Sequence, residues 1–283
     1  MRIGVSPYLN ARPFARGLVS QPGIEVVFAS PSRLADLLRC GLLDSALVSS
    51  SEYFNGDYVI VPEGAISSRG GGTDAVLFCR TTLAQVRVVA LDAASRSTNL
   101  LLRLALHWLR PGAAISFHTR PADSCRSLRE FDGCLMIGDI ALSSCHEAVL
   151  RYDLAELWHG MTNLPVVLTL WLARPDTDPQ LAKVIRRAYQ DGMAQLDDVV
   201  ANAAGELGWE EQFIRRYLTK VLDYSWGEEH EESLRRFGEA LFDLDLVEHK
   251  RPLRYLAQDM PAQAGGVNGG AGTEPNQPSS QAT

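Results

Sequence analysis

The chain has 283 residues, of which 46% are hydrophobic and 22% charged, so it can form one or two globular domains. Its net charge of −7, with no cluster of Lys or Arg, excludes a nucleic-acid binder, because phosphate recognition needs a basic face. The start, MRIGVSP, lacks an export signal, and no apolar stretch approaches the ~20 residues of a membrane span. The five cysteines form no CxxC pair, which is typical of reduced thiols. We therefore expect a cytoplasmic protein without nucleic-acid or membrane partners.

Short apolar runs alternate with helical patterns, which predicts βα units around parallel sheets. The first series has expected strands at 2–6, 24–29, 45–49, 58–62 and 74–80. Ser30 or Ser32 is the expected N-cap of a helix between the second and third of these strands. A second series has expected strands at 86–91, 114–118 and 133–138, helices at 97–109 and 122–130, and a helix starting at Asp139.

The pattern changes in the second half of the chain. A helix ended by a turn (151–165) precedes an apolar run (166–174) that predicts a central strand buried on both faces. Helices alone are expected after it, at 179–204, 209–221 and 228–247.

This order predicts an α/β protein of two lobes joined by two hinge connections. Lobe I should be discontinuous, with residues 1–80 and 167–260, and lobe II should span 81–166. The Gly-, Pro- and Ser-rich segment 261–283 is expected to be a disordered tail.

Ligands of open α/β sheets bind outside the carboxyl ends of the strands, so residues that follow the strands should line a cleft between the lobes. Most of these residues carry hydroxyl or amide groups. They are Ser6, Tyr8, Asn10, Ser49, Ser50, Ser67, Ser68, Arg69, Ser95, Ser97, Thr98, Gly138 and Asp139. Such residues are also common in turns and caps, so the prediction rests on their shared position.

The expected helix 97–109 is apolar almost all round, which predicts deep burial. Its first turn is Ser97, Thr98 and Asn99, without the Glu that completes a capping box. A buried N-terminus of this kind offers free N–H groups to a carboxylate in the cleft. A plain Ser cap explains the same residues.

The segment SSRGGGTD (67–74) is not a phosphate loop, because no Lys-Ser/Thr follows it and the next element is a strand. Arg69 is either a partner for a ligand carboxylate or an exposed Arg. The six histidines form no HExxH motif and accompany no GxSxG, and EEHEE (228–232) is interpreted as a solvated helix face. We expect a binding cleft without metal or cofactor.

Several stretches resemble one family: GVSPYLNARPF (4–14), ALVSSSEYF (46–54), AISSRGG (65–71), MIGDIAL (136–142) and DLAELWHGMTNLPVVLTLWLAR (153–174). In this order, across residues 2–260, they are similar to chorismate dehydratases of the futalosine route to menaquinone. The resemblance implies the two-lobed fold of type 2 periplasmic solute-binding proteins. It also implies a cofactor-independent hydro-lyase that eliminates water from chorismate, a small dianion, to give 3-[(1-carboxyvinyl)oxy]benzoate.

The resemblance assigns Asn10 to the family's YLN position, where it would bind the leaving hydroxyl or orient the substrate. A family hydroxyl precedes the strand after SSRG, but this chain has GGTD there. Ser68, Thr73 and Asp74 are all candidates for the missing role, and Asp74 is an acid–base candidate. Asp139 is better interpreted as a cap or hinge contact, and no general base is assigned.

Two alternatives keep the same fold. One is a ligand-binding receptor or sensor, against which the absence of an export signal and of a DNA-binding module argues. The other is the sister enzyme that makes 1,4-dihydroxy-6-naphthoate, which would need an accessible His that the strand exits do not offer. A monomer and a homodimer are both compatible with the sequence.

Overall fold

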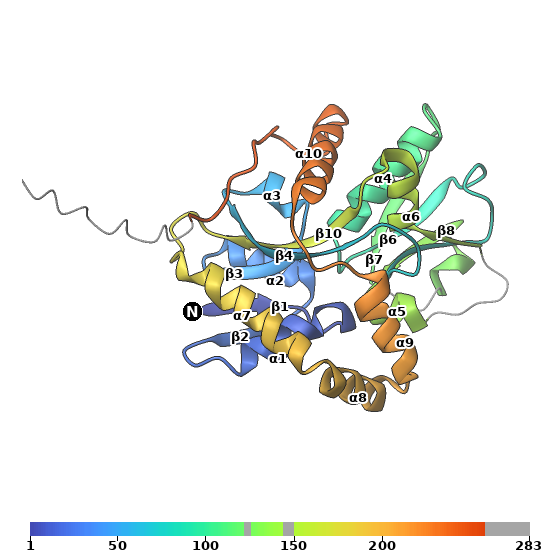
Figure 1. The fold of residues 1–283 in the computed structure, drawn as a ribbon. Helices are drawn as coiled ribbons and strands as arrows, with labels where there is room; N and C mark the ends of the chain where they lie inside the picture. The colour runs from blue at the N-terminus through green and yellow to red at the C-terminus, as the bar shows by residue number, and fades with distance from the viewer. Residues whose placement is uncertain (122–125, 144–149, 258–283) are drawn as a thin grey trace, which may run out of the picture.

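Two five-stranded sheets, covered by helices, form the framework of the computed structural model (Figure 1). The structure describes residues 1–121, 126–143 and 150–257. The expected tail 261–283 lies outside these residues, as does the first part of the expected helix 122–130. The described remainder of that helix is a short 3₁₀ turn, η2 (Arg126–Arg129).

The first sheet has the strand order β2-β1-β3-β10-β4. Its strands are β1 (Arg2–Val5), β2 (Glu25–Phe28), β3 (Ser45–Ser49), β4 (Val59–Ser68) and β10 (Val166–Ala173). The expected central strand is confirmed, because β10 pairs with β3 on one side and β4 on the other and is almost wholly buried.

The second sheet has the order β7-β6-β8-β5-β9. Its strands are β5 (Ala75–Cys79), β6 (Val88–Asp92), β7 (Ser116–Arg120), β8 (Gly133–Ile137) and β9 (Leu150–Asp153). We expected the strand of β5 to end the first lobe, but β5 pairs with β8 and β9 of the second sheet. The strand β9 was missed because a single helix was expected over 151–165.

The expectation of parallel sheets is wrong, since both sheets are mixed. The pairs β1–β2, β1–β3, β6–β7 and β6–β8 are parallel, whereas β10 and β5 run antiparallel to both of their neighbours. The chain passes from the first sheet into the second at β5, and it returns from the second sheet to the first at β10. A strand that arrives from the facing sheet starts at the edge where the parallel strands end, so it must run against them.

Ten α-helices are found among the described residues: α1 (Arg12–Val19), α2 (Pro31–Arg39), α3 (Glu52–Asn55), α4 (Ser97–Leu109), α5 (Gly138–Ser143), α6 (Leu154–Thr162), α7 (Gln180–Ala194), α8 (Leu196–Leu207), α9 (Glu211–Arg216) and α10 (Glu228–Asp243). Ser30 is the N-cap of α2, with its hydroxyl accepting the N–H of Arg33. The helix expected over 179–204 is interrupted at Gln195, and the one expected over 209–221 ends in a π-helical turn, η3 (Tyr217–Val221).

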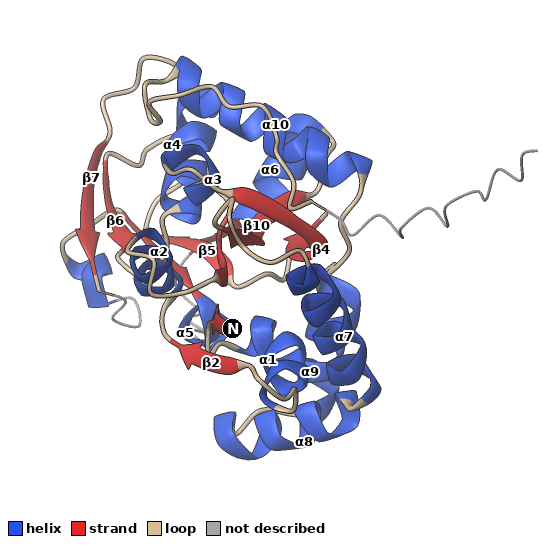
Figure 2. Ribbon diagram, turned by 90° about the vertical axis from the view of Figure 1, so that its left-hand side faces the viewer, coloured by secondary structure: helices blue, strands red, loops and turns tan. Residues whose placement is uncertain are grey.

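The helices form two groups on opposite sides of the molecule. In Figure 2, α1, α7, α8 and α9 lie together, and α4, α6 and α10 lie at the other end. The helices α1 and α7 pack backbone to backbone: a Cβ on Gly17 would lie 1.8 Å from the Ala188 oxygen, and one on Gly192 would lie 1.8 Å from the Pro13 oxygen. Within the described residues, none of the helices is long and apolar enough to cross a membrane.

Candidate functional site

A cavity lies between the two sheets, where the parallel strands end and β5 begins. The space between its lining atoms, including the part that is open to solvent, is about 440 Å³. Seven of the predicted site residues line it: Ser6, Tyr8, Asn10, Ser49, Asp74, Ser95 and Thr98. The rest of the lining is Pro31, Leu47, Ile66, Ala75, Ile137, Leu168 and Thr169.

Asn10 lies in a 3₁₀ turn, η1 (Leu9–Ala11), between the end of β1 and the start of α1. Its amide Nδ2 donates to Asp74 Oδ2 at 2.7 Å, and its backbone oxygen accepts the hydroxyl of Tyr224 at 2.8 Å. The Asn10 side chain is therefore fixed at the cavity wall, and its hydrogen bond to Asp74 connects the first sheet to the second.

Asp74 directly precedes β5 and is only 4% exposed. Burial raises its pKa to about 6, although the neighbouring Tyr217 hydroxyl and the backbone offset part of this effect. The Tyr217 hydroxyl itself is buried and does not meet the geometry of a hydrogen bond to any described residue. Asp74 thus titrates near neutral pH inside the cavity, which suits acid–base chemistry.

Tyr8 packs on the start of α5. Gly138 has a positive φ of 68°, and a Cβ there would lie 3.1 Å from the Tyr8 ring, so only glycine fits this position well. Burial, together with the carboxylates of Asp92, Asp139 and Asp74, raises the pKa of Tyr8. Tyr8 therefore stays protonated at neutral pH and can donate a hydrogen bond.

Asp139 links the two sheets, because its Oδ1 accepts the backbone N–H of Leu9 at 2.9 Å. Burial raises its pKa, and the Leu9 N–H and Arg12 lower it again in part. Asp139 does not line the cavity, and its position fits the expected cap or hinge contact.

The N-terminus of α4 is buried beside the cavity, where Ser95 and Thr98 line the wall. Ser95 accepts the backbone N–H of Thr98 at 3.3 Å. The hydroxyl of Thr98 is buried and has no hydrogen-bond partner among the described residues, and the same holds for Thr169 on β10. Buried polar groups are normally paired, so these two hydroxyls are candidates to bind a ligand.

Ser97 points away from the cavity into a cluster of serines at the end of β3. Its oxygen accepts the backbone N–H of Ser51 at 2.8 Å and lies 3.1 Å from each of the hydroxyls of Ser50 and Ser51. Ser50 also donates to the Val167 oxygen at 2.6 Å. Ser50 and Ser97 therefore hold α4 against β3 and β10 and do not line this cavity.

Apart from Ile66 and Asp74, the end of β4 and the segment between β4 and β5 do not line the cavity. Ser67 bonds to the Asp223 oxygen and the ring of His230, and Ser68 donates to the Val221 and Gly70 oxygens. Arg69 is exposed and pairs with Glu229. Thr73 donates from both its hydroxyl and its backbone N–H to Asp153, which is the N-cap of α6. Of Ser68, Thr73 and Asp74, only Asp74 lines the cavity.

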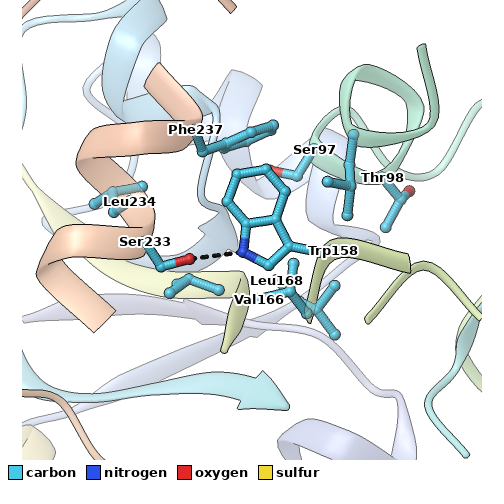
Figure 3. Close-up of a pocket in the computed structure, with 10 residues that line it drawn as sticks. Ser97, Thr98, Trp158, Val166, Leu168, Ser233, Leu234 and Phe237 are labelled. Atoms are coloured by element: carbon cyan, nitrogen blue, oxygen red, sulfur yellow. Dashed lines mark hydrogen bonds between the residues drawn. The ribbon is translucent and has the colours of Figure 1, made fainter. Parts of the chain in front are cut away.

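A second, mostly apolar cavity of about 280 Å³ adjoins the first (Figure 3). Trp158 on α6 and Phe237 on α10 form its walls, and the Trp158 indole N–H donates to Ser233 at 2.9 Å. Thr98 and Leu168 line both cavities. The Thr98 hydroxyl therefore lies at the boundary between an apolar and a polar space.

His230 corrects the interpretation of EEHEE as a solvated face. It is 5% exposed, and its Nε2 lies 3.0 Å from the Ser67 hydroxyl and 3.2 Å from Asp223 Oδ2. The hydrogen bond between His230 and the Asp223 carboxylate, more than any other contact, lowers the pKa of Asp223. Residues 230, 234, 237 and 241 form the buried stripe of α10, a spacing that is visible in the sequence.

The sequence did not predict Thr169 as a site residue, because it lies within a strand and the prediction drew on residues at strand ends. Leu47, Ile66 and Leu168 were missed because apolar strand residues give no signal of a site. Within the ranges that the structure describes, no group of three or more His, Cys, Asp or Glu side chains is placed to hold a metal ion.

Comparison with solved structures defines the class of the fold. A protein of Archaeoglobus fulgidus matches with a TM-score of 0.73 at 18% identity, covering 87% of this chain and 98% of its own. The alkanesulfonate-binding protein SsuA of Xanthomonas axonopodis, solved with bound MOPS, and the aliphatic sulphonate-binding SsuA of Escherichia coli match with TM-scores of 0.64 and 0.61. Their identities are 15% and 18%, and each match covers 88% of this chain and 94% of the other. The fold is that of the type 2 periplasmic binding proteins.

The chain belongs to the menaquinone biosynthesis family, whose model matches residues 1–243. A relative from Thermus thermophilus named chorismate dehydratase is 28% identical over 260 residues, which are 84% of this chain and 94% of the relative. The resemblance that the sequence motifs indicated is confirmed at the level of family and fold.

Proposed function

We propose that the protein is a cytoplasmic chorismate dehydratase that eliminates water from chorismate to give 3-[(1-carboxyvinyl)oxy]benzoate. Membership of the family and the name of the Thermus relative support this assignment. The observation that carries it is the Asn10–Asp74 pair, which lies in the cavity between the two sheets beside the buried N-terminus of α4.

The proposed elimination breaks two bonds of the substrate ring. The C–H bond on the enol-ether carbon gives its electrons to the ring, the neighbouring C–O bond breaks towards oxygen, and the departing hydroxide takes a proton to form water. The ring carboxylate activates the hydrogen, and aromatisation provides the driving force. The protein has only to hold the reactive conformer and stabilise the developing charge.

The described residues can divide these tasks. Asn10 would bind the leaving hydroxyl or orient the ring. The hydroxyls of Thr98 and Ser95 at the start of α4 would bind a carboxylate, as helix N-termini commonly do. The proton from the ring carbon can pass to the carboxylate of the substrate's own side chain, so the proposal assigns no protein base. The two sheets would act as lobes that close on the substrate.

The test is direct. Purified protein is mixed with chorismate, and the ultraviolet spectrum and the product mass are followed. Loss of one water, about 18 Da, with an aromatic product is the expected result. Binding without turnover would instead support the receptor alternative, which is favoured by the ligand-binding proteins among the structural neighbours. If neither binding nor turnover occurs, the proposal fails.

A further inference from the structure

No positive side chain lines the cavity among the described residues. Arg96, directly before α4, is paired with Glu52 and Asp36, the latter at 2.7 Å. Arg12, near the cavity, is paired with Glu206 at 2.8 Å. A dianion in this cavity must therefore be held by hydrogen-bond donors, because the described lining has no cation to neutralise it.

The one ionisable carboxyl in the lining is Asp74. Its Oδ2 accepts the Asn10 amide at 2.7 Å, and the Tyr217 hydroxyl is a neutral neighbour. An ionised Asp74 would repel a bound carboxylate and would have nothing to donate to it. A neutral Asp74 carries an O–H and can donate it to a ligand oxygen.

Among the described residues, the groups that face Asp74 carry no positive charge. From η1 come Asn10 and Tyr8, from η3 and the following turn come the hydroxyls of Tyr217 and Tyr224, and from α5 and β9 come Asp139 and Asp153. These neighbours are neutral donors or carboxyl groups. A second negative charge about 5 Å away would disfavour ionised Asp74 by a factor of roughly 10², at an effective dielectric constant of about 20.

We infer that the cavity binds its dianionic ligand with the Asp74 carboxyl in the neutral form, so that the carboxyl donates a hydrogen bond to the ligand and binding takes up a proton from solution. The inference rests on the proposed function in taking the ligand to be a dianion. The unpartnered hydroxyl of Thr98, which is 5% exposed, independently indicates that this cavity receives a ligand oxygen.

In the free protein, Asp74 is able to take up this proton near neutral pH. Because burial raises the pKa of Asp74 to about 6, the empty cavity holds mostly ionised Asp74 at pH 7.5. A ligand that raises this pKa further will bind with uptake of up to one proton. Its affinity will then fall by about tenfold per pH unit above the pKa of the free protein.

The experiment is calorimetric titration at about pH 7.5 in phosphate and in Tris, whose ionisation enthalpies differ. Two probes are used: benzene-1,3-dicarboxylate and 3-[(1-carboxyvinyl)oxy]benzoate. We expect uptake of about one proton per bound dicarboxylate, and an affinity that weakens about tenfold between pH 7 and 8. The Asp74→Asn variant should bind with no uptake and no pH dependence. The Asp139→Asn variant, which changes a carboxyl outside the lining, is the matched control and should retain the uptake.

Infrared difference spectra of the wild-type complex give a second readout that needs no variant, since a new protonated-carboxyl band is expected on binding. Binding without proton uptake would overturn the inference, as would uptake that persists in Asp74→Asn. If neither dicarboxylate binds, both this inference and the anion site fail. If both bind with uptake but chorismate is not converted, the inference is supported and the dehydratase assignment fails.

Discussion

The first turn of α4 carries two neighbouring hydroxyls with opposite surroundings. Ser97 makes three close contacts with Ser50 and Ser51, whereas the Thr98 hydroxyl is equally buried and has no partner among the described residues. Ser, Thr and Asn recur at the strand exits of this chain, and only their hydrogen-bond partners separate those that hold the protein together from those that face the cavity. A polar side chain that the fold already satisfies has little left to offer a ligand.

Asn10→Ala should have the largest effect on the cavity side of this comparison. It removes the amide that donates to Asp74 across the two sheets, so turnover of chorismate should fall by about 10² or more, with an unchanged circular dichroism spectrum. Steady-state kinetics measures the effect. Arg69→Ala is the control, because this side chain is exposed and distant from the lining, and it should keep its turnover. Full activity of Asn10→Ala would remove Asn10 from the mechanism.

Asp74→Asn should stabilise the free protein at neutral pH while it impairs function. The folded protein binds the Asp74 proton more tightly than the unfolded chain, so its stability falls as the pH rises from about 4 to about 6. A shift of about two pKa units corresponds to roughly 2–3 kcal/mol, which the amide would recover at pH 7. Urea unfolding of both proteins at pH 4 and pH 7 measures the difference. An equal stability difference at the two pH values would contradict the raised pKa.

Ser97→Ala tests the structural side of the comparison. It leaves the buried N–H of Ser51 without an acceptor, so the free energy of unfolding should fall by about 2 kcal/mol. Urea unfolding measures this loss. At a temperature where the variant is folded, affinity for benzene-1,3-dicarboxylate should be nearly unchanged. A stable variant that has lost this affinity would reverse the roles that we give to Ser97 and Thr98.

Thr98→Val should have the smallest effect, and in contrast to Ser97→Ala it should reduce ligand affinity but not stability. Valine has the same shape without the hydroxyl, so stability should be retained or slightly increased, because no hydrogen bond is lost. Affinity for the dicarboxylate should fall by about tenfold, because a hydrogen bond to a charged group contributes about 1.5 kcal/mol at the low end of its range. The same titration measures it. Unchanged affinity would show that the free hydroxyl is not used.

The sequence was most informative where polar residues interrupt apolar runs. The sequence predicted the start of α4, the turn that holds Asn10 and the central strand β10. For α4 the reason is that a helix with an apolar body is buried, and its polar first turn is then buried with it. Strand direction could not be predicted in the same way. It depends on which sheet a strand joins, and for β5 that is decided by pairing with β8 and β9 more than 50 residues further on.

The division between cavity and structural roles was also out of reach. Ser68 and Asp74 flank the same loop, and only the packing of η3 and α6 determines that Ser68 bonds to the Val221 oxygen while Asp74 enters the cavity. His230 is different, since its place in the apolar stripe of α10 was visible in the sequence. The four glutamates around it obscured that spacing.

The Asn10–Asp74 hydrogen bond joins a residue after β1 of one sheet to a residue before β5 of the other. Any separation of the two sheets breaks this bond and admits water to the carboxyl, so its pKa returns towards the value of an ordinary aspartate. Each opening would therefore release the proton of the neutral acid to bulk solvent, and each closing on a ligand would take one up again. Ligand release and proton release would then occur in one and the same motion.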